Sequence, residues 1–523
     1  MIKLRLAPYS GGDWQWDGAR YTTAGGESEV APVLHPLVEQ AAVSDGRRTL
    51  IMVREKIAGH PAPEAAVRQV PEAGYDQARR AAGRWPADWV LTEWTQDEPV
   101  QVTAGPCRTT PLYLAADGAT LHGSWEMGDL ARWAGGLNPR ETARLLLYRP
   151  RYSSETAFTG IHRLTERATA HFGGALFLRY PEPALHSGPR ELAEDADVLG
   201  AFVEAMDGAW DLRPLGAVTT ALHLTGGVDS GVLATRAAER FPGRFPTAAL
   251  LIGGPGRAQQ IRRRQQIREA VRFADPDLLR DAMVAAPLHR DCARVNAELV
   301  SPYDEPLYHP FRKLTEALAA AGTHAVVTGL GGDEMVALSQ EEYPHRPMGE
   351  LTDAARLPWV GEHARSAAEF ADIGIAPPAM VNSMTLLSLE TTAPLLLRAG
   401  IWPVHPFADP VMVQLGEWLP LNWRRLKQLQ RRRLAALDLG REVVQPKLRE
   451  SFAEVVQHTL TVHARPLFAR MLRDGSPLFD NKLVNPDGLR RAVDRLRDGA
   501  YREDGDAQLL EVTTLHLAAE AFL

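Results

Sequence analysis

Residues 223–232 read HLTGGVDSGV, and the expected architecture of the second half of the chain follows from them. The run AVTTALHL (217–224) before the two glycines is β-branched and apolar, and residues 231–240 after them contain no helix breaker. We therefore predict a strand, a glycine turn and a helix. Gly226 and Gly227 permit positive φ and a close backbone approach, and the helix N-terminus adds partial positive charge. The turn is expected to hold an anion, although neither the Walker pattern nor the dinucleotide fingerprint is present.

A second glycine turn, VTGLGGDE (327–334), follows another apolar run. Between the two turns, strand-like and helix-like stretches alternate, which predicts a parallel sheet with ligands at its carboxyl edge. The expected strands are 217–224, 247–252, 281–286 and 324–328, and the expected helices are 230–240, 257–273, 292–300 and 311–321. After residue 350 the chain is expected to form a helical layer flanking the sheet. Each acidic residue of the turns also has a simpler interpretation, because Asp229 and Asp333 could merely cap helices or turns.

The first 180 residues have a different pattern, with short apolar runs separated by turns such as AADGAT (115–120). This pattern predicts an antiparallel sheet with hairpins, and helices expected at 63–83 and 139–147 make the unit α+β. The stretch 180–195, rich in Pro and Glu, is typical of a linker. We expect two domains, residues 1–185 and 196–523.

Composition narrows the functional class. The 523 residues are 45% hydrophobic and 24% charged, which is ordinary for a globular protein. Two distant cysteines, Cys107 and Cys292, argue against a disulfide scaffold and favour a reducing compartment. No apolar run is long enough for a membrane span, and the formal charge of -7 gives no general attraction to nucleic acid. A cytoplasmic protein without membrane or nucleic-acid partners is expected.

Three segments resemble known families. TGGVDS (225–230) resembles the SGGxDS loop of the ATP pyrophosphatases, with Thr225 in place of the first Ser, and GLGGDE (329–334) resembles the second loop of asparagine-synthetase-like proteins. RYSSETAFTGIHRLTERATAHF (151–172) resembles the end of their N-terminal amidotransferase domain. The resemblance implies an amidotransferase-like domain followed by an ATP-pyrophosphatase domain. That N-terminal domain normally uses a cysteine directly after the initiator Met, whereas here Ile2 follows Met1, so we expect it to be inactive.

The resemblance implies an ATP site with Mg²⁺. Asp229 and Asp333 are the expected metal ligands, since Mg²⁺ prefers carboxylate and phosphate oxygens. The residues expected to hold pyrophosphate are Thr225, Gly226, Gly227 and Ser230. Those expected at the adenosine or in the second loop are Leu224, Leu251, Ile252, Gly329 and Gly331. Glu334 either stabilises the N-terminus of a helix with its negative charge or orients the residues that contact the ligand.

Further positions are assigned by place in the family's motif order. QPKLRESF (445–452) matches the RxKxxF segment, which makes Lys447 the candidate cation for the developing negative charge, although a single lysine is usually a solvated surface residue. SPYDEP (301–306) matches a segment between the two loops, with a turn and helix cap as the simpler interpretation. Tyr343 and Glu390 form a candidate dyad that would act as a general base. The simpler interpretation is that Glu390 is a single buried glutamate on a packed helix.

The wider sequence is most similar to lasso-peptide macrolactam cyclases, for example in PLYLAADGATLHGSWEMGDLARW (111–133) and LLLRAGIWPVHPFADP (395–410). This implies an ATP-dependent ligase that adenylates an Asp or Glu side chain of a core peptide and joins it to the peptide's N-terminal amine. The implied partners are the precursor peptide, a leader peptidase and a leader-recognition protein. Alternatives are a β-lactam synthetase-like or other small-molecule ligase, a glutamine-dependent asparagine synthetase and an inactive scaffold.

Two arginine-dense stretches, 257–272 and 424–433, remain unassigned. They could receive a peptide or its leader. Their spacing also fits solvated helix faces, which is the interpretation we favour.

Overall fold

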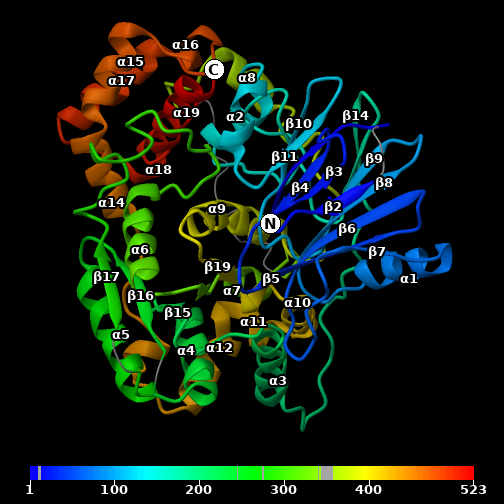
Figure 1. The fold of residues 1–523 in the computed structure, drawn as a ribbon. Helices are drawn as coiled ribbons and strands as arrows, with labels where there is room; N and C mark the ends of the chain where they lie inside the picture. The colour runs from blue at the N-terminus through cyan, green and yellow to red at the C-terminus, as the bar shows by residue number, and fades with distance from the viewer. Residues whose placement is uncertain (10–12, 244, 274–275, 340, 343–356) are drawn as a thin grey trace.

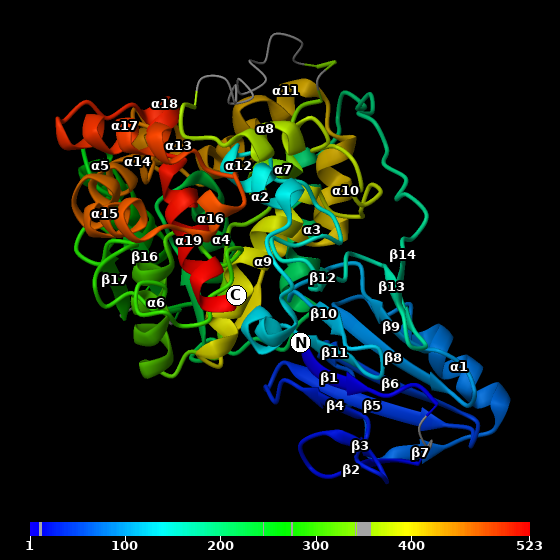
Figure 2. The same ribbon diagram turned by 90° about the horizontal axis from the view of Figure 1, so that it is seen from above.

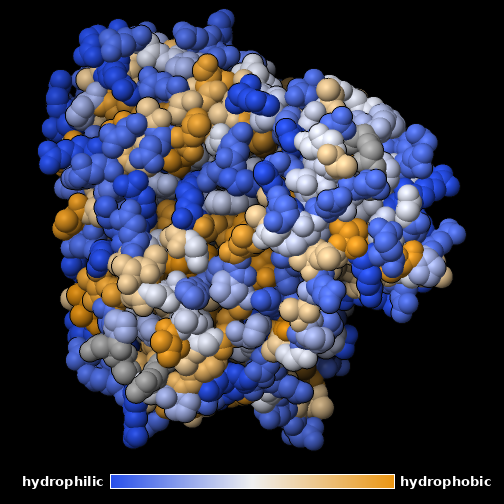
Figure 3. Space-filling model, in the orientation of Figure 1, coloured by the Kyte–Doolittle hydropathy of each residue, from blue (hydrophilic) through white to orange (hydrophobic). Residues whose placement is uncertain are grey.

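The computed structural model describes all residues of the chain except 10–12, 244, 274–275, 340 and 343–356. Figures 1 and 2 show two antiparallel sheets built from the N-terminal part, a parallel sheet on the opposite side, and the C-terminal helices gathered above the parallel sheet. The predicted mixture of α and β structure, with a parallel sheet in the second half, is confirmed. On the face seen in Figure 3, hydrophilic and hydrophobic residues are interspersed.

The first antiparallel sheet has the strand order β12-β10-β11-β1-β4-β3-β2. Its strands are β1 Ile2–Leu6, β2 Trp14–Trp16, β3 Tyr21–Thr23, β4 Glu29–Pro32, β10 Tyr113–Ala116, β11 Leu121–Ser124 and β12 His162–Arg163. In β1 the sequence IKLRL alternates buried and exposed residues, as period-two strands do. The expected hairpin at AADGAT is confirmed, since Ala116 of β10 pairs with Leu121 of β11 and Gly118 has a φ of 87°.

The second antiparallel sheet has the order β14-β13-β9-β8-β6-β5-β7, with β5 and β7 paired in parallel. Its strands are β5 Val38–Ser44, β6 Arg48–Glu55, β7 Val67–Gln69, β8 Trp89–Thr95, β9 Val100–Ala104, β13 Thr169–Phe172 and β14 Leu176–Arg179. The two sheets pack face to face through apolar residues such as Leu4 and Ile51. Helix α1 (Glu72–Ala82) covers the other face through Tyr75. The helix expected at 63–83 is therefore shorter than predicted, because β7 occupies part of that stretch.

The parallel sheet has the order β17-β16-β15-β18-β19, and its neighbouring strands pair in parallel. Its strands are β15 Thr220–His223, β16 Thr247–Leu251, β17 Asp277–Asp281, β18 Ala325–Val327 and β19 Trp402–Val404. The chain proceeds from β15 toward β17 on one side, and β18 and β19 lie on the other. Because β15 and β18 are neighbours, the loops that follow them leave the sheet side by side, at the switch point where α/β proteins bind ligands.

Helices surround this sheet and connect it to the N-terminal part. Their bounds are α2 Pro139–Leu146, α3 Val198–Asp211, α4 Val228–Arg240, α5 Gly256–Val271, α6 Tyr308–Ala320, α7 Gly332–Met335, α8 Glu362–Ala368, α9 Ser383–Arg398, α10 Pro410–Trp418, α11 Leu421–Arg424, α12 Gln428–Ala436, α13 Arg441–Val444, α14 Ala453–His458, α15 Arg465–Asp474, α16 Pro477–Asp480, α17 Pro486–Arg497, α18 Glu503–Asp506 and α19 Leu509–Phe522. Helix α6 packs on β16 and β17, and α9 packs on β19. The last helix, α19, also packs on α2 of the N-terminal part, and its Phe522 stacks on Phe158 with ring centroids 4.7 Å apart.

A buried carboxylate joins the N-terminal part to the parallel sheet. Glu55, at the end of β6, accepts hydrogen bonds from Trp402 Nε1 of β19 at 2.7 Å and from Arg213 Nη2 at 2.6 Å. Its side chain is fully buried, as is most of Arg213. The two parts therefore share a buried ion pair as well as apolar contacts.

Two predicted elements of the sheet region are wrong. The strand expected at 281–286 lies earlier, as β17, and the residues expected to form a helix at 292–300 form turns. The guanidinium of Arg294 donates to the backbone carbonyls of Ser301, Asp304 and Glu305, which ties this stretch into a compact turn region. In the part of the chain that the structure describes, no helix has the length and apolar character to cross a membrane.

Candidate functional site

The first glycine loop connects β15 to α4 and is held by its own hydroxyl groups. Gly226 has a φ of 92°, and a Cβ there would lie 3.1 Å from the backbone oxygen of Gln260. Gly227 N donates to Thr225 Oγ1 at 3.2 Å, and Thr225 Oγ1 lies 3.1 Å from Ser230 Oγ. The loop thus needs glycine at position 226, and it presents the N-terminus of α4, where an anion is stabilised.

The second glycine loop lies against the first, as the sequence predicts. Gly331 has a φ of 91° and precedes α7. A Cβ on Gly329 would lie 3.3 Å from Asp229 Cβ, and a Cβ on Gly332 would lie 2.6 Å from Asp229 Cγ. Glycine at these positions is what permits the two loops to touch.

Asp229 and Asp333 meet at a lysine that the sequence reasoning did not identify. Lys427 Nζ lies 2.6 Å from Asp229 Oδ2 and 2.7 Å from Asp333 Oδ1. It belongs to the arginine-dense stretch 424–433, which we interpreted as a solvated face or peptide site. Within that stretch, no sequence signal separates this lysine from its neighbours.

Burial and charge oppose each other at this cluster. Burial raises the pKa of Asp229 to about 6, although the ammonium of Lys427 acts in the opposite direction. Burial also acts to lower the pKa of Lys427, but Asp229 and Asp333 outweigh it and raise that pKa. Asp229 Oδ1 is buried without a hydrogen-bond partner among the described residues, whereas Asp333 is 75% exposed. Two carboxylates, one with an unused buried oxygen, match the donor set that Mg²⁺ takes together with phosphate.

No group of three or more His, Cys, Asp or Glu side chains among the described residues is arranged to hold a metal by itself. A metal at Asp229 and Asp333 would therefore depend on oxygens from a ligand. This dependence is usual for Mg²⁺ sites that work with phosphates.

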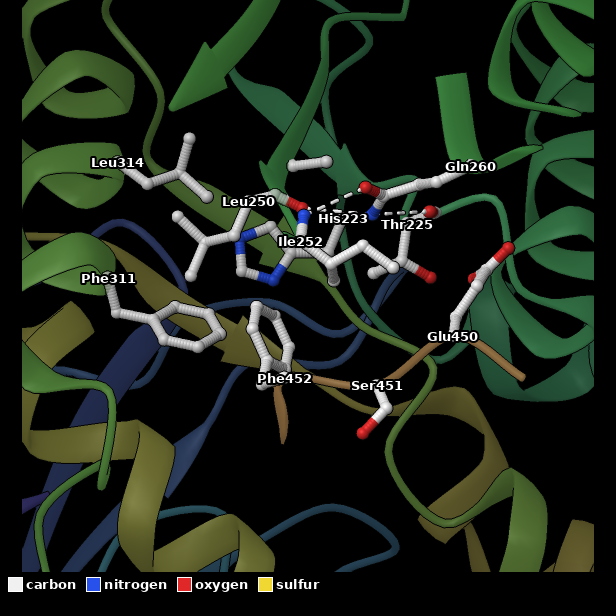
Figure 4. Close-up of a pocket in the computed structure, with 11 residues that line it drawn as sticks. His223, Thr225, Leu250, Ile252, Gln260, Phe311, Leu314, Glu450, Ser451 and Phe452 are labelled. Carbon is white, nitrogen blue, oxygen red and sulfur yellow. Dashed lines mark hydrogen bonds between the residues drawn. The ribbon is translucent and has the colours of Figure 1, made fainter. Parts of the chain in front are cut away.

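A cavity of about 230 Å³ adjoins the first loop. Figure 4 shows the rings of Phe311 and Phe452 beside the imidazole of His223. The lining residues are His223, Thr225, Ala249, Leu250, Ile252, Gln260, Phe311, Leu314, Glu450, Ser451 and Phe452. Of the residues expected at the adenosine, Ile252 lines this cavity, whereas the side chain of Leu224 is buried in the main hydrophobic core.

Helix α5 holds the surroundings of the cavity in place. Gln260 accepts from Ile252 N at 3.0 Å and donates to the carbonyls of Leu250 and Thr225. Arg263 and Arg264 are 1% and 2% exposed. The interpretation of stretch 257–272 as a solvated face is therefore wrong for these two arginines.

The neighbouring Gln259 fixes the segment that contains Lys447. Its Oε1 accepts from the backbone N–H groups of Lys447 and Leu448 at 2.9 and 3.0 Å, and its Nε2 donates to the Leu448 carbonyl at 2.8 Å. Arg263 pairs with Glu450 in the same segment. The side chain of Lys447 itself is exposed.

Glu390 has a different environment from the one expected of a base. It receives hydrogen bonds from Tyr113 Oη at 2.5 Å and from Arg163 Nε at 2.8 and 2.9 Å, all from the N-terminal part. The carboxylate is thus occupied in a buried ion pair. Tyr343 lies outside the described residues. Asp304 of the SPYDEP segment pairs with Arg398 at 2.7 Å.

An open cleft of about 580 Å³ lies on the other side of the second loop. Its lining includes Asp333, Glu334, Met384, Leu426 and Lys427. Asp333 and Lys427 of the acidic cluster therefore border the open cleft, whereas the smaller apolar cavity is bordered by Thr225 of the first loop.

No protein-family model matches the chain. A search of the curated proteins finds no significant match either.

Proposed function

We propose that the chain uses ATP and Mg²⁺ to activate a carboxylate and joins it to an amine, and that it acts as a lasso-peptide macrolactam cyclase. One observation carries the proposal of activation chemistry. Two glycine loops at neighbouring strand ends bring Asp229 and Asp333 together beside a helix N-terminus and an apolar cavity. The peptide substrate is supported by the sequence resemblance to lasso-peptide cyclases.

The first step forms an acyl-adenylate. A carboxylate oxygen of the substrate attacks the α-phosphorus of ATP, and pyrophosphate leaves. The first loop, Thr225 to Ser230, would bind the phosphates, and Asp229 and Asp333 would hold the Mg²⁺ that neutralises their charge. Lys427 and Lys447 are the candidate cations for the departing pyrophosphate and the developing oxyanion.

The second step forms the amide. The amine attacks the acyl carbon, AMP leaves, and the nitrogen loses a proton. An α-amine has a pKa of about 8, so part of it is free at neutral pH without a strong base. The occupation of Glu390 by Arg163 argues against a base dyad that includes this residue. Holding the folded peptide in the open cleft would supply the effective concentration that ring closure needs.

The resemblance also supports a set of partners. These are a precursor peptide, a leader peptidase and a leader-recognition protein. Their presence would explain how a core peptide with a free N-terminus reaches this chain.

The test is to incubate the protein with ATP, Mg²⁺ and a candidate core peptide and to analyse the products by mass spectrometry and nucleotide chromatography. We expect AMP, pyrophosphate and a peptide lighter by one water. ADP and phosphate as products would refute the adenylation mechanism. Turnover of small amino-acid substrates without any peptide product would refute the cyclase and favour a small-molecule ligase.

A further inference from the structure

His223 is the last residue of β15, and its ring faces the cavity beside the first glycine loop (Figure 4). The residue is 9% exposed, and its Nε2 is buried without a hydrogen-bond partner among the described residues. The ring of Phe311 lies 6.0 Å away, centroid to centroid. A buried polar atom without a partner is costly, so an unpaired nitrogen at a cavity wall indicates that a ligand supplies the partner.

The other polar side chains of the cavity are already engaged. The amide of Gln260 bonds to three backbone groups, and Thr225 Oγ1 bonds within the glycine loop. Glu450 is paired with Arg263. The exposed Ser451 accepts a hydrogen bond from the backbone of residue 453. Among these lining side chains, His223 is the one whose buried polar atom remains unpaired.

The chemistry of the ring limits what can bind there. Burial lowers the pKa of His223 to about 4, and the nearby charge of Arg264 acts in the same direction. The imidazole is therefore neutral at pH 7, with one nitrogen that donates and one that accepts. A neutral ring between Phe311, Phe452 and Leu250 suits a flat heterocycle better than an anion.

We propose that His223 recognises the edge of the purine base of ATP and favours adenine over guanine. The inference rests on the proposed function, because it assumes that the phosphates occupy the adjoining loop. Guanine presents a carbonyl, a ring N–H and an amino group along its edge, whereas adenine presents a ring nitrogen and an amino group. In a cavity with one available polar side chain, adenine has fewer polar groups without a hydrogen-bond partner than guanine has. Because unpaired polar groups reduce affinity, adenine should bind more tightly.

The test compares nucleotide binding by the wild type and His223→Leu, which keeps an apolar side chain and removes the ring nitrogens. Kd values would be measured by calorimetry with Mg²⁺ for ATP, GTP, 1-deaza-ATP, 7-deaza-ATP and purine riboside triphosphate. We expect the substitution to raise the Kd for ATP about tenfold, which corresponds to about 1.4 kcal/mol of binding free energy. We also expect it to narrow the preference for ATP over GTP. The analogue that lacks the recognised atom should bind both proteins equally.

His309→Leu is the matched control. His309 is also buried, and its Nδ1 has no hydrogen-bond partner among the described residues, but it does not line the cavity. This variant should bind all the nucleotides as the wild type does. His223→Gln, which retains hydrogen-bonding capacity, should recover part of the lost affinity.

Two outcomes would overturn the inference. One is an unchanged Kd for ATP in His223→Leu, and the other is a parallel loss for ATP, GTP and every analogue. Failure of the wild type to bind ATP at all would instead refute the proposed function. The two failures are therefore distinguishable.

Discussion

The contact between the two glycine loops can be tested with one methyl group, in the variant Gly332→Ala. A Cβ on Gly332 would lie 2.6 Å from Asp229 Cγ and 2.9 and 3.0 Å from its two carboxylate oxygens. Ordinary van der Waals contact begins at 3.4 Å, so the Asp229 carboxylate has to move by about 0.8 Å. Misplacing a catalytic group by about 1 Å can lower the rate about 100-fold. Lys427 holds the carboxylate on another side, with its Nζ 2.6 Å from Asp229 Oδ2, so a shift of the carboxylate also disturbs this ion pair.

The folded state should tolerate the same change. Gly332 lies in the first turn of α7 and has no left-handed φ, so alanine can adopt its backbone conformation. We expect Mg²⁺-dependent exchange of pyrophosphate into ATP, measured with the carboxylate substrate, to fall about 100-fold. The melting temperature should fall by no more than about 2 °C, because strain of about 1–2 kcal/mol is small against an unfolding entropy of about 2.1 cal/mol/K per residue.

Gly208→Ala in α3 provides the control. A Cβ there would meet no atom within 4 Å, and its φ is not left-handed. Exchange should be unchanged in this variant, and the helix should gain about 0.5–1 kcal/mol of stability. If Gly332→Ala retained exchange within threefold of Gly208→Ala, the close approach of the loops would not be required for activation, and our reasoning about Asp229 would be wrong.

Two further predictions concern stability. Glu55→Ala leaves the buried Arg213 without its carboxylate, which should cost about 3–5 kcal/mol. With an unfolding entropy of about 2.1 cal/mol/K per residue, this lowers the melting temperature by about 3–5 °C if all 523 residues unfold together. Glu362→Ala, in an exposed ion pair, should lower it by under about 1 °C, and equal effects would contradict the shared ion pair. The second prediction is acid sensitivity, because burial lowers the pKa of His223 to about 4 and of His405 to about 3. Near and below pH 6.5 these histidines bind protons in the unfolded chain but not in the folded one, so the free energy of unfolding decreases as the pH is lowered. The decrease is about 1.4 kcal/mol per histidine from pH 7.5 to pH 5.5. Denaturation at both pH values should show His223→Leu losing about 1.4 kcal/mol less than the wild type, and an identical loss would disprove this assignment.

The sequence was sufficient where local residue types determine the backbone. Each glycine loop follows an apolar run that is a strand of the parallel sheet, and Gly226 has a positive φ, whereas Gly227, of which the same freedom was expected, has a φ of -66°. The strand β17 was missed because DLLRD carries charged residues at both its ends and one inside, as an edge strand tolerates. Apolar periodicity detects buried strands better than such an edge.

Contacts between residues far apart in the sequence determine the features that could not be predicted. Arg263 is buried because Glu450, 187 residues later, and the Val443 carbonyl receive its guanidinium. From spacing alone, an arginine-rich helix has the pattern of a solvated face. The pairing of Glu390 with Arg163 spans 227 residues and was equally invisible. Neither contact leaves a local signature in the chain.

Lys427 shows how this limit affects the functional site itself. Its ammonium lies within hydrogen-bonding distance of both carboxylates that we assign to Mg²⁺. Because one positive charge then faces two negative ones, the cluster can remain partly buried without a metal. A divalent cation that binds the same oxygens has to share them with Lys427 or displace it toward the phosphates. If the proposed Mg²⁺ and nucleotide bind here, Lys427 would be exchanged for the metal at these oxygens, and sequence order alone did not separate this lysine from the arginines around it.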